Sequence, residues 1–147
     1  MKKKIIVLII VLAAIGLGVG AFLFFRPRKG GVLLGERQFV YITSHQHTRK
    51  SGGYTKEEEY RDTDEEGRAK CEAVKTFLAE STIARTLSYE KSISPDNLTI
   101  SCINGEDFSF VMLYLESGLV QIDRRFYEIK DWNEEAFLKL LDLSIIR

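Results

Sequence analysis

One uninterrupted apolar stretch occupies the start of the chain. Ile5 to Phe25 carries no charge over 21 residues, with three lysines before it and Arg26, Arg28 and Lys29 behind it. A helix of this length spans roughly 30 Å, the hydrocarbon thickness of a bilayer, whereas the apolar part of a signal peptide runs about 7 to 15 residues. The pattern predicts a transmembrane helix at residues 5–25 after a cytoplasmic tail at residues 1–4.

The alternative is an export signal that is cut off. Val19, Gly20 and Ala21 place small residues where signal peptidase needs them, but cleavage there would leave the apolar "FLFF" at the start of the mature chain. We therefore expect the helix to be retained. Because moving a tail with three lysines across a membrane is unfavourable, we expect the tail inside the cell and the domain outside, bound to the cell membrane by a single pass.

Small residues recur every four positions within this stretch. Gly16 and Gly20 form a GxxxG pattern, and Ala14 with Gly18 repeats the spacing. Such spacing lets two membrane helices approach closely, which predicts pairing of the helix with a second copy or with a partner helix. The alternative is that glycine and alanine are simply common in membrane spans.

The pattern then changes to that of a folded domain. Residues 26–36, with Pro27 and Gly30-Gly31, are typical of a linker. Residues 37–45 alternate and predict a strand, and the polar residues 46–63 predict a long exposed loop. Asp64 begins a predicted helix that ends near Ser81, because its apolar positions follow helical spacing: Cys71, Val74, Phe77 and Leu78.

Four strands and a helix follow. The strands are expected at residues 83–92, 98–103, 108–116 and 119–129, with hairpin turns at Asn104-Gly105 and at Ser117-Gly118. Asp131 with Glu134 resembles a capping box before the last helix. The apolar stripe of that helix is Phe137, Leu140 and Leu141.

The predicted order is β-α-β-β-β-β-α. We therefore expect an α+β domain at residues 37–147, a five-stranded antiparallel sheet with two helices on one face. This layout resembles one half of the TATA-binding-protein fold, and it is similar to small membrane-anchored extracytoplasmic domains of unknown function in Gram-positive bacteria. The resemblance covers the layout from about Arg37 onward and implies an architecture, without functional residues.

Hairpin register assigns the two faces of the sheet. Two-residue turns would pair Ile100 with Ser109 and Leu113 with Ile122. The expected core face then collects Leu98, Ile100, Cys102, Val111, Leu113, Leu115, Val120, Ile122 and Phe126. The opposite face carries an aromatic and methionine stripe with polar flanks, typical of a surface that binds a protein or an envelope partner: Phe108, Phe110, Met112, Tyr114 and Tyr127. The alternative is that the long loop, the linker or a second subunit covers this stripe.

Charge narrows the class of partner. The whole chain is neutral, but six of the 21 basic residues precede residue 30, while all 21 acidic residues follow it. A domain with this acidic excess lacks the basic face that binding of nucleic acid requires, so we expect no nucleic-acid partner.

Candidate catalytic chemistry is sparse. His45 and His47 lie near the acidic run Glu57-Glu58-Glu59, which makes a metal-dependent enzyme the alternative function. Histidines at a strand end are more often solvated, so we expect neither a metal nor a cofactor.

The two cysteines are expected to be buried. Cys71 falls on the apolar stripe of its helix and Cys102 on the core face of its strand, which predicts inert thiols rather than a thiol enzyme. The same placement permits a disulfide between them. With no paired carboxylates or triad evident, we expect a binding or accessory module rather than an enzyme.

Overall fold

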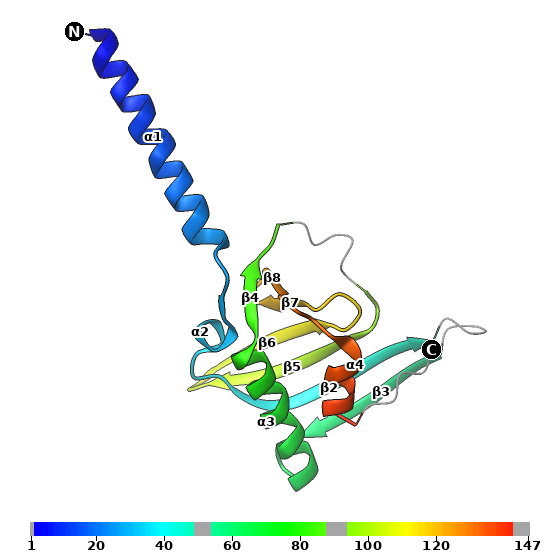
Figure 1. The fold of residues 1–147 in the computed structure, drawn as a ribbon. Helices are drawn as coiled ribbons and strands as arrows, with labels where there is room; N and C mark the ends of the chain where they lie inside the picture. Colours follow the sequence, from blue (N-terminus) through cyan, green and yellow to red (C-terminus); the bar gives the residue numbers. More distant parts are fainter. Residues whose placement is uncertain (1, 49–53, 88–93, 143–147) are drawn as a thin grey trace.

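The computed structural model describes residues 2–48, 54–87 and 94–142 (Figure 1). In these residues the chain forms four helices and eight strands. In chain order they are α1 (Lys2–Phe25), β1 (Arg28–Lys29), α2 (Gly30–Leu34), β2 (Gln38–Thr48), β3 (Tyr54–Arg61), α3 (Glu65–Glu80), β4 (Thr82–Arg85), β5 (Asn97–Asn104), β6 (Asp107–Tyr114), β7 (Leu119–Ile122), β8 (Arg125–Ile129) and α4 (Glu134–Leu140).

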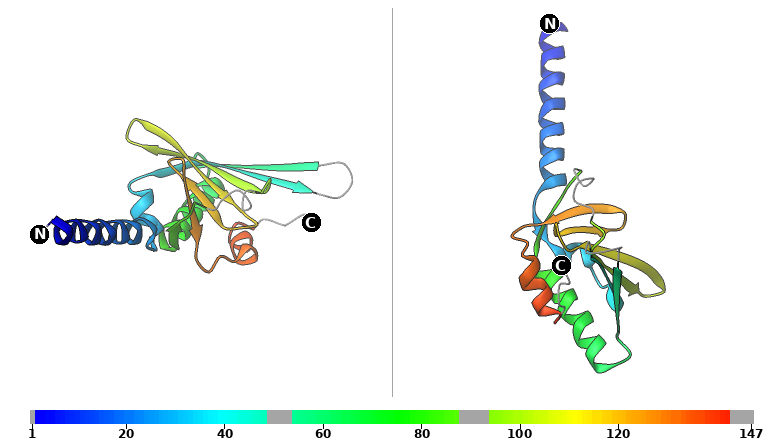
Figure 2. Two further views of the ribbon diagram at one scale, coloured as in Figure 1. Left: turned by 90° about the horizontal axis from the view of Figure 1, so that it is seen from above. Right: turned by 90° about the vertical axis from the view of Figure 1, so that its right-hand side faces the viewer.

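Helix α1 projects from the domain as a single rod (Figures 1 and 2). Its segment Ile5–Phe25 has a mean hydropathy of 3.0, and none of it is buried against the rest of the chain. It is therefore long and apolar enough to span a membrane.

The domain is α+β with one antiparallel sheet, as expected, but the sheet has eight strands rather than five. Their order is β1-β4-β8-β7-β6-β5-β2-β3. The expected exposed loop at residues 46–63 is wrong for its described part, because residues 46–48 extend β2 and residues 54–61 form β3, paired from Tyr41 opposite Arg61 to Thr48 opposite Tyr54. Residues 49–53 lie outside the described residues. The strand expected at residues 83–92 is shorter, and its later part, residues 88–93, lies outside the described residues.

The expected linker is also part of the fold. Arg28 pairs with Ile83, and the amide of Gly30 donates to the carbonyl of Ser81 at 2.9 Å. Gly30 and Leu34 of α2 are buried. As a result, Arg26 and Pro27 alone separate α1 from the first strand.

Helices α3 and α4 pack on the same face of the sheet and share one core with it. The predicted bounds of α3 are confirmed: Asp64 is the N-cap and accepts a hydrogen bond from the amide of Gly67 at 2.7 Å, and Ser81 is the C-cap. In α4 the expected capping box is wrong, since Asn133 caps the helix through the amide of Ala136.

The stripe of α4 also differs from the expected one. Phe137 and Leu141 are fully buried, but Leu138 completes the stripe, while Leu140 is exposed. The single tryptophan, Trp132, precedes this helix, donates through Nε1 to the carbonyl of Leu115 at 2.8 Å and packs against Phe137.

Both predicted hairpin registers are shifted by two residues. Ile100 pairs with Val111 rather than Ser109, and Leu113 pairs with Val120 rather than Ile122. Because side chains alternate with a period of two, this shift leaves the side chains of β5, β6 and β7 on their expected faces. All expected core residues except Phe126 lie in the core.

Phe126 is the exception because of a turn that the sequence pattern did not predict. The expected strand at residues 119–129 is two strands, with Asp123 and Arg124 forming a two-residue turn at φ of 50° and 62°. Folding back at this point exchanges the faces of the residues that follow. Tyr127 therefore lies in the core, and Phe126 lies opposite Gln121 on the other face.

Candidate functional site

The face of the sheet away from α3 and α4, here called the open face, carries the most exposed aromatic side chains of the described domain. Phe108 and Phe110 are 59% and 54% exposed, and Ile103 beside them is 38% exposed. The two rings meet edge to face, with centroids 4.9 Å apart. We call Ile103, Phe108 and Phe110 the hairpin-tip patch.

The sheet register creates this patch. Ile103 lies directly opposite Phe108, and Ser101 lies opposite Phe110, at the end of the β5–β6 hairpin. The turn of this hairpin uses Gly105 at a φ of 64°. On the opposite side of the strand Ser109 accepts a hydrogen bond from Nε of Arg37 at 3.3 Å. The aromatic side chains are thus presented by a strand that is fixed from behind.

The other expected contact residues are less accessible. Met112 is half-buried on the open face between Thr99 and Gln121. Tyr114 lies on the same face but is only 6% exposed, and its burial raises the pKa of its hydroxyl. The placement of Tyr127 on this face is wrong, since it belongs to the core.

Within the described residues, neither of the segments expected to cover the stripe lies over the patch. Residues 46–48 and 54–61 of the expected loop belong to β2 and β3, and the expected linker contributes β1 and α2. Both exposed rings therefore remain open to solvent or to another molecule.

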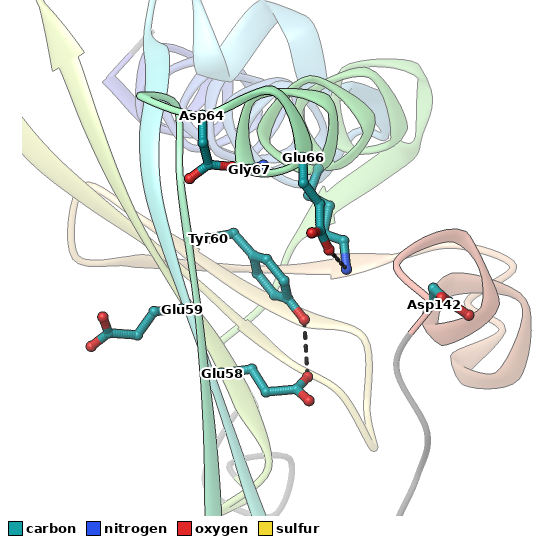
Figure 3. A pocket seen from close by; sticks show the side chains of 8 residues that line it. Glu58, Glu59, Tyr60, Asp64, Glu66, Gly67 and Asp142 are labelled. Atoms are coloured by element: carbon teal, nitrogen blue, oxygen red, sulfur yellow. Dashed lines mark hydrogen bonds and ion pairs between the residues drawn. The ribbon is translucent and has the colours of Figure 1, made fainter.

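A polar pocket of about 610 Å³ lies on the other side of β3, between the start of α3 and the end of α4 (Figure 3). Figure 3 shows Glu58 and Tyr60 pointing into it, while Glu59 points away to the opposite side of the strand. The hydroxyl of Tyr60 donates to Oε2 of Glu58 at 2.9 Å. Burial, and then this carboxylate, raise the pKa of Tyr60 well above its usual value.

The negative charge of this pocket is compensated only in part from within. The ammonium of Lys70 lies 3.2 Å from Oε1 of Glu66 and 4.2 Å from the ring centre of Tyr60. Asp64 is occupied as the cap of α3. The arrangement is that of a charged surface stabilising the α3 terminus, and sequence reasoning missed it because β3 was expected to be a loop.

Ser44 and Gln46 are buried polar residues on the helix-side face of β2. Ser44 lies directly opposite Glu58 in the register. The side chains of Ser44 and Gln46 have no hydrogen-bond partner in the described part of the chain. Because they flank the acidic wall of the pocket, they add polarity there without adding charge.

Of the two histidines, the structure describes the side chain of His45, which lies beside a single carboxylate. Nδ1 of His45 lies 3.3 Å from Oε1 of Glu57, its direct cross-strand neighbour. The side chain of His47 is outside the described part. Across residues 2–48, 54–87 and 94–142, no group of three or more His, Cys, Asp or Glu side chains is placed to hold a metal ion.

The cysteines are free thiols in the structure, and both are buried. Burial raises the pKa of Cys71 and of Cys102 to about 11. A thiol that stays protonated at neutral pH is a poor nucleophile, so their positions favour a packing role.

The expected helix-pairing residues Gly16 and Gly20 lie on α1. A Cβ atom added at either would meet nothing within 4 Å. Pairing of α1 with another helix stays a prediction.

No protein-family model, curated protein or solved structure matches the chain. The resemblance to half of the TATA-binding-protein fold and to anchored extracytoplasmic domains accordingly stays a prediction, and the function is argued from the surfaces alone.

Proposed function

We propose that the protein is a single-pass membrane protein whose domain, outside the cell, serves as a binding or accessory module for another protein. The observation that carries the proposal is the hairpin-tip patch, where two phenylalanine rings remain more than half exposed on a firmly held strand. An apolar helix none of whose residues is buried in the domain supplies the membrane anchor.

The chemistry of the patch favours a protein partner. Ile103, Phe108 and Phe110 have no side-chain hydrogen-bonding group, and a sugar polymer needs donors and acceptors for its hydroxyl groups. Apolar side chains of another protein can fill such a surface, since aromatic residues are enriched at protein interfaces. The half-buried Met112 beside the patch adds an adaptable contact.

The alternative of an enzyme has less support. The thiols are buried, with pKa values raised to about 11, and His45 is paired with a glutamate rather than with a nucleophile. The described thiols and the imidazole of His45 therefore lack the pairing of a nucleophile with a base that activates a nucleophile.

Photo-crosslinking in membranes of the source organism tests the proposed contact. A photoreactive phenylalanine analogue at position 108 should yield a discrete protein adduct, which Phe110→Ser should diminish. The matched control places the analogue at Thr76, which is exposed on α3. Equal adducts at both positions, or none at 108, would contradict the proposal, and an adduct of twice the chain mass would identify a second copy.

The buried thiols allow a direct test of the side of the membrane. A cysteine introduced by Thr76→Cys is the exposed thiol, and a membrane-impermeant maleimide should label it in intact cells but leave the unmodified chain unlabelled. Labelling only after lysis would place the domain inside the cell. Release of the chain by alkaline carbonate would show that α1 is not embedded.

A further inference from the structure

Three arginines converge where α1 meets the domain. They line a pocket of about 380 Å³ together with the last turns of α1; its walls are Gly20, Leu23, Phe24, Arg28, Leu33, Arg85, Arg125 and Tyr127. We call it the junction pocket. Its arginines come from β1, β4 and β8, and sequence reasoning did not connect them because they are far apart along the chain.

The sheet register explains the convergence. Arg85 lies directly opposite Tyr127 in the β4–β8 pair, and Arg125 is two residues before Tyr127 on the same face of β8. Side chains so related stand next to one another on one face. Arg28 lies in β1, directly after α1, and its Nη2 donates to the carbonyl of Leu23 in α1 at 3.2 Å.

The pocket has positive charge without internal compensation. No carboxylate is among its lining residues, and none of the three arginines forms an ion pair within the described ranges. The guanidinium of Arg85 instead lies over the ring of Phe24, 3.7 Å from its centre. Guanidinium groups held close together favour a bound anion, and their geometry fits the oxygens of a phosphate.

Tyr127 adds a polar group that lacks a partner. Only 6% of this residue is exposed, and it lines the pocket. Its hydroxyl makes no hydrogen bond to another described residue. The hydroxyl oxygen itself is accessible from the pocket, so it can donate to an acceptor that binds there.

The remaining walls are apolar and belong to α1. Gly20, Leu23 and Phe24 lie in the last turns of the apolar segment Ile5–Phe25, where a membrane helix leaves the hydrocarbon and enters the headgroup layer. The pocket therefore combines cations, a free hydroxyl donor and an apolar wall at the depth of lipid phosphates.

We propose that the junction pocket binds the phosphate of an anionic phospholipid headgroup, with the acyl chains lying along α1. Arg85 and Arg125 contact the phosphate oxygens, Tyr127 donates its hydroxyl, and Arg28 closes the side next to the helix. This inference rests on the proposed function in one respect, namely that α1 lies in a membrane.

Native mass spectrometry of the full chain, released from detergent micelles containing equal amounts of phosphatidylglycerol and phosphatidylcholine, tests the proposal. The chain should retain one phosphatidylglycerol in preference to phosphatidylcholine. Arg125→Gln should weaken this retention about tenfold, the effect of losing one charge-assisted contact. The matched control is Arg124→Gln, which removes the same charge next door but outside the pocket and should leave retention unchanged.

Further measurements distinguish a lipid phosphate from free phosphate, and failure of the lipid site from failure of the membrane anchor. An excess of inorganic phosphate should not displace the lipid, and displacement would show a site for free phosphate instead. Equal retention of both lipids, or equal loss in both arginine variants, would overturn the lipid site. Carbonate extraction of cell membranes that contain the protein tests separately whether α1 is embedded. A chain that stays embedded but shows no lipid preference refutes only this inference.

Discussion

Arg37 and Asp123 form a two-pronged ion pair across the fold, with Nη2 lying 2.8 and 2.7 Å from the two carboxylate oxygens. Nη1 of the same guanidinium donates to the carbonyls of Leu33 and Leu34 at 2.8 and 2.9 Å. The arginine side chain is 15% exposed and the aspartate side chain 56% exposed. A single side chain thus connects the segment after α1 to the β7–β8 turn.

Replacing the two partners should therefore have unequal effects. Arg37→Met should lower the free energy of unfolding by about 2 kcal/mol, because it removes the side-chain donor of the partly buried Leu33 carbonyl and Ser109 hydroxyl. Asp123→Asn should cost less than about 1 kcal/mol, because water can solvate the exposed end of the pair. Thermal and urea unfolding of the full chain in mild detergent, followed by the fluorescence of the single Trp132, measures both. Equal costs would show that the ion pair, rather than the carbonyl contacts, dominates.

Adjacent glycines of α2 should respond in opposite ways to alanine. A Cβ atom at Gly30 would clash with the carbonyl oxygen of Leu78, whereas at Gly31 the nearest atom is 3.5 Å away. Gly30→Ala should destabilise the domain by about 1 to 3 kcal/mol through overpacking. Gly31→Ala should be neutral or slightly stabilising, since alanine favours helix. Indistinguishable melting temperatures for the two variants would refute the close packing of α2 on α3.

Stability should fall in alkaline solution because of the thiols. Burial raises the pKa of Cys71 and Cys102 from 9.0 to about 11 in the folded chain. Their contribution is fully present below about pH 9 and is lost as the pH rises through about 11, at up to about 1.4 kcal/mol per pH unit for each thiol. The Cys71→Ala/Cys102→Ala variant should show a shallower fall between pH 8.5 and roughly 10.5 in urea unfolding. Parallel curves for variant and parent would contradict the assignment.

The hairpin-tip patch should contribute little to folding. Phe108→Ser and Phe110→Ser should each change the free energy of unfolding by less than about 0.5 to 1 kcal/mol, because both rings are more than half exposed. The contrasting variant is Leu113→Ser on the core face of the same strand, where the leucine is fully buried, and this change should destabilise strongly. Loss of folding in both phenylalanine variants would make the patch part of the core.

The elements that could be predicted are those whose signals are local. Asp64 caps α3 and the apolar spacing from Cys71 to Leu78 marks its buried face, so its bounds follow from a few neighbouring residues. The core face of the central strands was also predictable, because a register error of two residues does not alter which side a residue faces.

The missed elements depend on partners elsewhere in the chain. Strand β3 lies at the edge of the sheet and carries charged residues on both sides, which is how edges avoid pairing with other molecules, and its sequence therefore resembles a loop. Strand β1 has only two residues and exists because β4 lies beside it. The β7–β8 turn places Asp123 and Arg124 at positive φ without a glycine, which left no turn signal to detect.

The candidate sites also differ in whether their residues are close along the sequence or only in the folded chain. Phe108 and Phe110 could be found because they alternate along one strand. Arg28, Arg85 and Arg125 could not be grouped, because their proximity depends on the pairing of β4 with β8 and on the direction in which α1 leaves the domain.

The two-residue connection between α1 and β1 has a mechanical consequence. Arg26 and Pro27 can span at most about 7 Å, and proline stiffens that short path. With α1 in a bilayer, any tilt or rotation of the helix is passed directly to the sheet, so the position of the β5–β6 hairpin above the lipid follows the orientation of α1. A partner must accordingly meet the hairpin where the helix holds it, because the connection between α1 and β1 is too short to act as a flexible arm.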